Sequence, residues 1–180
     1  MDPYIFVGRA TEKGESLLSL CGGIGLELRD VTTKDITVVD IVPQYLFQVA
    51  HQYPNVKVVE SDALEYLRTQ PDQSVDVISI IDGIEHMTKG TGLNLITEMK
   101  RVAKKEILLF TPQGHVDGGY LKNEPHNAWG IEGADERQTH KSGWTALELK
   151  DLGFEMLNSA EDVSQHGEPY TALMMRFRHV

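Results

Sequence analysis

The stretch that decides the fold is SLLSLCGGIGLELRDVTTKDITVVD, residues 16–40. An apolar run at its start leads into a glycine cluster, and a second apolar run, 36–39, ends in Asp40. This pattern predicts a buried strand, a tight turn into a helix, and a second strand parallel to the first. Glycine lets the backbone approach a ligand closely, and the start of a helix points unpaired N–H groups toward that ligand. The cluster consists of Gly22, Gly23 and Gly25.

Asp40 suggests what kind of ligand this turn receives. Its carboxylate can accept two hydrogen bonds from a ribose diol, and the tips of adjacent parallel strands meet at the edge where open α/β sheets bind ligands. A dinucleotide fingerprint starting at Gly23 would need a third glycine where Leu28 stands, and the chain has no G-K-[ST] phosphate loop. The stretch therefore predicts a nucleoside-containing cofactor and disfavours a dinucleotide; a Rossmann-like domain with another ligand is the alternative.

The same stretch resembles the first motif of class I S-adenosylmethionine (SAM) methyltransferases, in which an acidic residue precedes G-x-G-x-G. Ser19 stands where the family often has the acid, and Cys21 stands where it often has the first glycine. The resemblance covers almost the whole chain. It implies a Rossmann-like α/β fold in a single domain, 1–180, with a doubly wound seven-stranded sheet of order 3-2-1-4-5-7-6, strand 7 antiparallel, and helices on both faces.

Composition limits the class of protein and its partners. The 180 residues, 41% hydrophobic and 24% charged, suit one globular core. A net charge of −10 repels polyanions, so a nucleic-acid partner is disfavoured. With Cys21 as the single cysteine there is no intrachain disulfide, and we expect this thiol to be a small core group rather than a nucleophile. No apolar run is long enough to span a bilayer and no signal-peptide layout is seen, so we expect a cytoplasmic protein without a membrane partner.

The remaining elements follow from periodicity and capping signals. We expect strands at 56–59, 75–81, 106–112, 154–157 and 170–177, and helices at 24–31, after Pro43, at 93–102 and at 146–152. Thr145 and Glu148 form a capping box for the last helix. We also expect a short strand or a cover over the cofactor at 4–7, a loop bracketed by Gly90 and Gly92, a polar turn at 161–168 and a substrate loop at 113–143.

The resemblance implies further cofactor contacts. Ile41 would lie against the adenine, and Asp62, with the small Ala63 beside it, would bond the adenine amino group. Asp62 with Glu65 is also a D-x-x-E helix cap, and both roles can hold together. The expected cofactor-binding set is Ser19, Cys21, Gly22, Gly23, Gly25, Asp40, Ile41, Asp62, Ala63 and Asp82.

The stretch DGIEHM, 82–87, follows the fourth strand, where the transferred methyl group must point. Because the sulfonium methyl of SAM is already electrophilic, much of the acceleration comes from positioning, and a base is needed only for some acceptors. His86 or Glu85 is the candidate base, with His140 of H-K-S-G-W as a further catalytic candidate; a structural role for the two histidines stays open.

A metal-binding role for the same residues is a second possibility. Asp82, Glu85 and His86, with His140, resemble the metal set of small-RNA 3′-end 2′-O-methyltransferases, and the first three also resemble ubiquinone-pathway O-methyltransferases. A divalent ion there would hold the acceptor oxygens and lower their pKa, and the histidines favour a Mn²⁺-like ion. An E-H pair after strand four is common in the family without a metal, so the leading expectation has none.

The leading hypothesis is a SAM-dependent methyltransferase acting on an O or N atom of a small molecule or exposed polar group, with S-adenosylhomocysteine (SAH) as product. One alternative is a metal-assisted RNA 2′-O-methyltransferase, and another is a SAM-binding module without catalysis. DNA base methylation is disfavoured, because IDGIEH stands where such enzymes carry D/N-P-P-Y/F/W. The sequence leaves open the acceptor and the oligomeric state.

Overall fold

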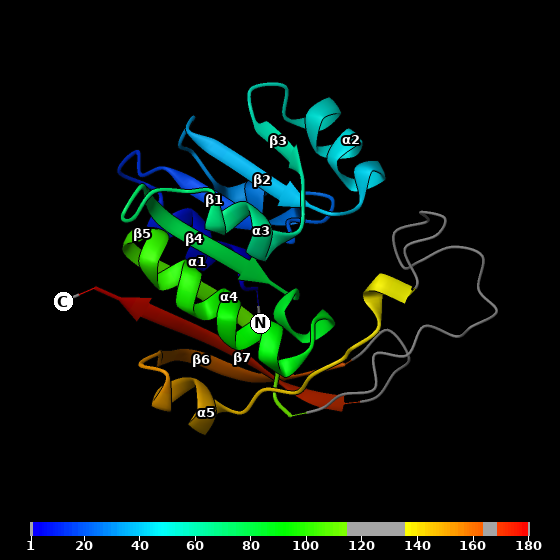
Figure 1. Ribbon diagram of the computed structural model, residues 1–180, viewed down its shortest axis with the longest axis vertical. Helices are drawn as coiled ribbons and strands as arrows, with labels where there is room; N and C mark the ends of the chain where they lie inside the picture. Colours follow the sequence, from blue (N-terminus) through cyan, green and yellow to red (C-terminus); the bar gives the residue numbers. More distant parts are fainter. Residues whose placement is uncertain (1, 115–135, 164–168, 180) are drawn as a thin grey trace.

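The strands of the computed structural model form one twisted sheet (Figure 1). The structure describes residues 2–114, 136–163 and 169–179. Within these residues the order is β3-β2-β1-β4-β5-β7-β6, with β7 antiparallel to β5 and β6 and the other pairs parallel, as expected. The strands are β1 (Leu17–Leu20), β2 (Ile36–Asp40), β3 (Lys57–Glu60), β4 (Val75–Ile81), β5 (Ala103–Pro112), β6 (Glu155–Val163) and β7 (Pro169–Arg178).

Helices cover both faces of this sheet. Figure 1 shows α3 and α4 in front of it and α1 behind. Side chains that alternate along β1 separate two cores: Leu18 packs with α3, α4 and α5, and Leu17 packs with α1, α2 and η1. The helices are α1 (Tyr4–Ala10), α2 (Pro43–Gln52), α3 (Ala63–Arg68), α4 (Lys89–Val102) and α5 (Ala146–Asp151), with 3₁₀ turns η1 (Leu26–Asp30), η2 (Ile84–His86) and η3 (Glu136–Gln138).

Three helices begin as the sequence predicts. Pro43 is at the first turn of α2, where its missing N–H leaves no hydrogen bond unmade. Asp62 caps α3 by accepting from the N–H groups of the second and third helical residues. Thr145 and Glu148 form the reciprocal capping box of α5. Pro43 and the Asp62 cap mark where α2 and α3 begin, beyond the carboxyl ends of β2 and β3.

The N-terminal segment corrects one expectation. A strand was one of two possibilities at 4–7, but these residues are helical and belong to α1. Four mostly apolar residues fit a strand or a helix equally well, and packing decides between them. Val7 is buried against the same core as Leu28 of η1, which fixes the helix behind the sheet.

The glycines at 90 and 92 correct a second expectation. They do not bracket a loop, because both lie inside α4, which Thr88 caps through the N–H of Thr91. Close packing against Trp144 explains why residue 92 is a glycine, because a Cβ at this position would lie 2.5 Å from the Trp144 ring. The helix therefore begins at Lys89 and includes both glycines, although glycine has a poor helix propensity.

Two further boundaries differ from the sequence expectation. The helix expected over 24–31 is a short 3₁₀ turn, η1. The polar stretch expected to turn from 161 continues β6 as far as Val163, because it is paired with β7. The expected turn at 164–168 lies outside the described residues, as do residues 115–135 of the expected substrate loop. In the described part of the chain, no helix combines the length and apolar character that crossing a membrane requires.

Candidate functional site

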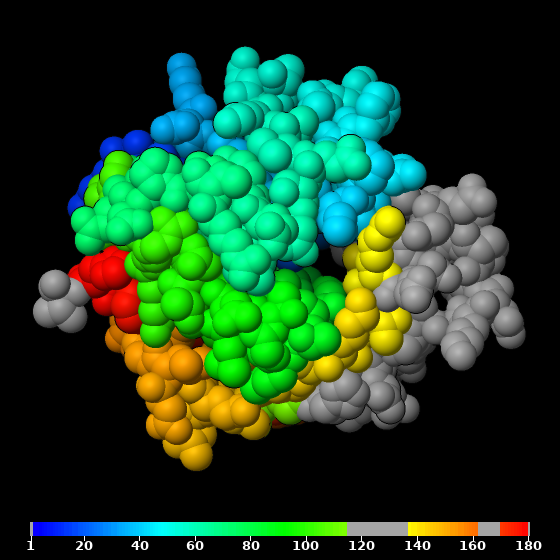
Figure 2. Space-filling view, viewed as in Figure 1, coloured from blue at the N-terminus to red at the C-terminus, as the bar shows by residue number. Residues whose placement is uncertain are grey.

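A cavity of about 440 Å³ lies at the carboxyl ends of β1, β2 and β4. Figure 2 shows a hollow on this side, bordered by segments that follow β3 and β4 and by the segment after η3, in yellow. Most of the expected cofactor residues line it. From the expected set, the lining contains Cys21, Gly22, Gly23, Asp40, Ile41, Asp62, Ala63, Asp82 and His86.

Asp40 holds the glycine turn against the tip of β2. One carboxylate oxygen accepts from the N–H of Gly23 at 2.9 Å, and the other accepts from the N–H of Val42 at 2.8 Å. The side chain is buried, which raises the pKa of Asp40, while these backbone bonds oppose that shift. Because a carboxylate has about four lone-pair positions, each oxygen keeps capacity for a ligand hydroxyl.

The turn itself depends on its unusual backbone. Cys21 and Gly23 have φ values of +52° and +51°, in the region that L side chains rarely adopt. A Cβ at Gly22 would lie 2.5 Å from Oγ of Ser19, so no side chain fits there. Burial raises the pKa of the Cys21 thiol, and nearby carboxylates raise it further, so the thiol stays protonated. This agrees with a small core group rather than a nucleophile.

On the side of the cavity near β3, the wall contains the apolar side chain of Ile41 and the carboxylate of Asp62. Ile41 is 48% exposed and faces this space from the end of β2. Asp62 uses Oδ1 for the cap of α3, at 2.9 and 3.1 Å from the N–H groups of Leu64 and Glu65. Its other oxygen leaves an acceptor for a ligand, so the cap and the expected adenine contact are compatible.

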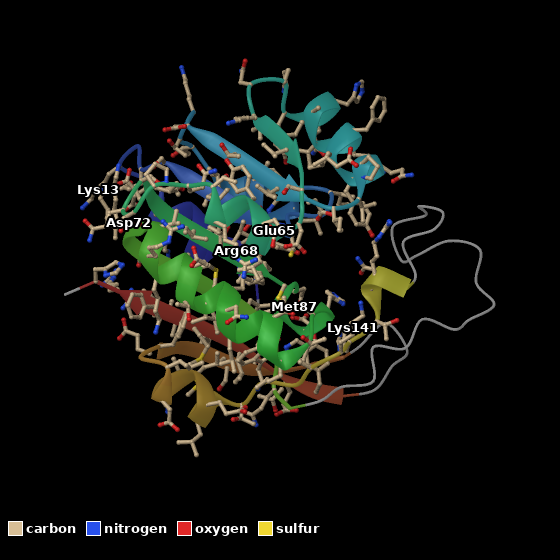
Figure 3. All side chains as sticks on the ribbon, viewed as in Figure 1. Lys13, Glu65, Arg68, Asp72, Met87 and Lys141 are labelled. Atoms are coloured by element: carbon tan, nitrogen blue, oxygen red, sulfur yellow. The ribbon has the colours of Figure 1, made fainter. Side chains whose placement is uncertain are left out.

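The opposite side is formed by the segment after β4 and by the segment after η3. Asp82 has φ +49° at the strand end, and His86 lies in η2. Figure 3 labels Met87 and Lys141, which come from these two segments and both line the cavity. Burial lowers the pKa of His86, and its Nδ1 is buried without a hydrogen-bond partner among the described residues. At neutral pH this imidazole is therefore neutral.

Glu85 is buried and is not among the residues that line the cavity. It is 2% exposed, its carboxylate accepts from the Thr111 hydroxyl at 3.0 Å, and burial raises the pKa of Glu85 to about 7. Its main-chain oxygen accepts from the N–H groups of Lys141 and Ser142 at 2.8 and 3.1 Å. Glu85 therefore joins η2 to β5 and to the segment that carries His140.

Four expected site residues are not among those that line the cavity. Ser19 is fully buried and donates its hydroxyl hydrogen bond to Glu27. Gly25 caps η1 with φ +79°. Glu85 accepts a hydrogen bond from Thr111, and the His140 ring lies edge to face with the His86 ring, with 5.0 Å between the ring centroids.

The lining also includes residues that the sequence reasoning did not single out, notably Tyr4, Glu27, Arg137 and Lys141. For Tyr4 there was a partial indication, because a cover over the cofactor was one of the two possibilities for residues 4–7. Glu27 had a detectable signal: it is an acid directly after the glycine turn of a motif whose usual acid is replaced by Ser19.

The expected metal set is only partly assembled. Ligand atoms of Glu85, His86 and His140 lie within 4.8 Å of one another, and Asp82 is not part of this group. One carboxylate and two imidazoles suit a transition-metal ion such as Mn²⁺ better than Mg²⁺. The unpartnered Nδ1 of His86 fits a ligand role, whereas the Glu85 carboxylate already accepts from Thr111.

The comparisons with known proteins agree with this geometry. The family described as "Methyltransferase domain" matches residues 18–106, which include the glycine turn, Asp40, Asp62 and the segment after β4. No curated protein matches the chain.

Several solved structures share the fold at low identity. The YcgJ protein of Bacillus subtilis is 13% identical with a TM-score of 0.69, over 99% of each chain. The N-methyltransferase NodS of Bradyrhizobium japonicum, in complex with SAH, is 14% identical with a TM-score of 0.66, over 98% of this chain and 85% of NodS.

A third solved structure contains both product and acceptor. It is the 1,6-didemethyltoxoflavin-N1-methyltransferase of Burkholderia thailandensis, with 1,6-didemethyltoxoflavin and SAH bound. It is 14% identical with a TM-score of 0.64, over 98% of this chain and 77% of that one. At these identities the structural likeness establishes the fold, and the family match adds the sequence evidence. Residues 18–106 therefore match the methyltransferase-domain family, and the whole chain has the Rossmann-like fold and sheet order of class I SAM-dependent methyltransferases.

Proposed function

We propose that this protein transfers a methyl group from SAM to an oxygen or nitrogen atom of a small molecule or exposed polar group. The observation that carries the proposal is that one cavity contains both the Asp40–Gly23 turn and His86. A nucleoside cofactor bound at the Asp40–Gly23 turn would share this cavity with His86. The donor and the acceptor would therefore meet in one cavity.

The residues near β2 and β3 would hold the adenosine part of the cofactor. Asp40 accepts from the ribose hydroxyls through the lone pairs that the turn leaves available, and Ile41 lies against the adenine. Asp62 accepts from the adenine amino group. When bound, SAM supplies a sulfonium methyl group that is already electrophilic, so the task of these residues is to fix its position.

His86 is the residue that we assign to the acceptor. Its buried imidazole is neutral at neutral pH, so it can accept a hydrogen bond or a proton from an acceptor hydroxyl or amine. His140 supports the ring of His86 edge to face, and Glu85 fixes the segment behind both. In this proposal Glu85 and His140 are positioning residues for His86.

The size and charge of the site favour a small acceptor. A cavity of about 440 Å³ must hold the cofactor and part of the acceptor, which suits a small ligand. The net charge of −10 disfavours a long polyanion. The N-methyltransferases among the solved neighbours make a nitrogen acceptor reasonable.

The test is transfer of radiolabelled methyl groups from SAM to a panel of small phenols, amines and carboxylates. His86→Ala should lower turnover of the best acceptor about 100-fold or more, while SAH affinity changes less than threefold. The matched control is His51→Ala, an exposed histidine of α2, which should leave both values unchanged. Equal turnover by wild type and His86→Ala would remove His86 from the mechanism.

One observation favours the alternative of metal-assisted RNA 2′-O-methylation, namely the closeness of Glu85, His86 and His140. There the ion would be held by these three side chains and would lower the pKa of the acceptor hydroxyl. Methylation of an RNA 3′ end that rises with added Mn²⁺ and is absent in His140→Ala would support it. SAH binding without turnover on either panel would instead indicate a non-catalytic binding module.

A further inference from the structure

Glu27 presents a buried carboxylate to the cavity without a full set of partners. It lies in η1, is 4% exposed and is one of the residues that line the cavity. One oxygen accepts from the Ser19 hydroxyl, and Oε2 has no hydrogen-bond partner in the described part of the chain. A buried carboxylate oxygen without a donor costs free energy, so its retention calls for a ligand that supplies one.

The charge around Glu27 favours a cationic ligand. Burial raises the pKa of Glu27, and the hydroxyls of Ser19 and Ser79 oppose that shift. The same carboxylate also acts on Tyr4. Burial raises the pKa of Tyr4 to about 12, and the charges of Asp82 and Glu27 contribute to this shift. An ammonium group placed here would pair with the Glu27 carboxylate, donate a hydrogen bond to Oε2 and offset the cost of burying this group.

The position of Glu27 within the sheet identifies which part of the cofactor reaches it. Asp40 ends β2 and Asp62 lies just after β3, so under the proposed function the adenosine would bind on that side. Glu27 bonds Ser19 of β1, which is paired in register with Ser79 of β4, on the other side of the glycine turn. With the adenosine held near Asp40 and Asp62, the part of the cofactor beyond its sulfur would extend toward Glu27, and the cation that this part carries is an α-ammonium group.

We propose that Glu27 binds the α-ammonium group of the methionine part of SAM through Oε2, in place of the acid that the family often carries at Ser19. This assignment rests on the proposed function. Ser19 keeps a structural role, since its hydroxyl orients the Glu27 carboxylate. An Asp at 19 and a Glu at 27 would compete for the same space and charge.

Isothermal titration with two ligands tests the assignment. SAH carries the ammonium group, and 5′-methylthioadenosine keeps the adenosine and sulfur but lacks the amino acid part. Glu27→Gln should weaken SAH binding about 10- to 100-fold, because a charged hydrogen bond is lost, and should change 5′-methylthioadenosine affinity less than threefold. The control Asp40→Ala should weaken both ligands, since both contain the ribose.

Two further measurements test the assignment: recovery of SAH affinity by a second substitution, and comparison of SAH with an analogue that lacks the amino group. Ser19→Asp combined with Glu27→Ala should recover most of the SAH affinity lost in Glu27→Ala alone. Wild type should also bind SAH at least tenfold more tightly than the analogue with hydrogen in place of the α-amino group, a measurement that requires no variant to fold. Equal affinity for these two ligands, or equal loss of both ligands in Glu27→Gln, overturns the assignment. Wild type that binds neither SAH nor 5′-methylthioadenosine contradicts the proposed function itself.

Discussion

Glu85 is a carboxyl group that the fold keeps away from water, and its titration should be visible in stability. Burial raises the pKa of Glu85 from 4.5 to about 7. The folded state therefore binds more protons than the unfolded state between these pH values. The stability that this group contributes is fully present below about pH 4.5 and is lost as pH rises through 7.

Glu85→Gln removes this titration while keeping an acceptor for Thr111. Relative to wild type, the variant should gain up to about 3 kcal/mol of unfolding free energy between pH 5 and pH 8. Urea unfolding of both proteins at the two pH values measures this difference. A difference between the two proteins that is the same at pH 5 and pH 8 would show that Glu85 does not titrate as proposed.

Helix α4 shows at the scale of an element how packing overrides local propensity. Gly90 has open space around its Cβ position, whereas a Cβ at Gly92 would meet the Trp144 ring at 2.5 Å. We expect Gly90→Ala to stabilise the protein by up to about 1 kcal/mol and Gly92→Ala to destabilise it by about 1–3 kcal/mol. Denaturant midpoints of the two variants decide this, and shifts in the same direction would contradict the packing described for Trp144.

The sequence predicted regular elements better than it predicted exceptions. The strand 75–81 and the capping box at Thr145 follow from local patterns, and the structure has both as predicted. The segment 4–7 was ambiguous because a short apolar run fits either type of element. The loop expected around Gly90 and Gly92 was wrong, because the contact with Trp144, far along the chain, cannot be seen in a local pattern.

At the scale of the whole molecule, the sheet order and the cavity follow from a few strand-end residues. Asp40 and Gly23 were expected side by side, and the hydrogen bond between them confirms that placement. The expected set placed Ser19 at the cofactor, but its side chain is used within the fold. Glu27 was missed because only the tight path of η1 returns this side chain toward β1. Residues 115–135, where the expected acceptor contacts partly fall, lie outside the described chain.

We propose that this cavity binds an adenosine-type methyl donor at Asp40. The most direct test of this proposal is calorimetric titration of SAH into wild type, into Asp40→Ala and into the control Asp35→Ala, an exposed acid just before β2. We predict one site per chain in wild type and in the control, and a loss of about tenfold or more in Asp40→Ala, because a charged acceptor of the ribose hydroxyls is removed. Absence of SAH binding by wild type, or unchanged affinity in a folded Asp40→Ala variant, would contradict the account.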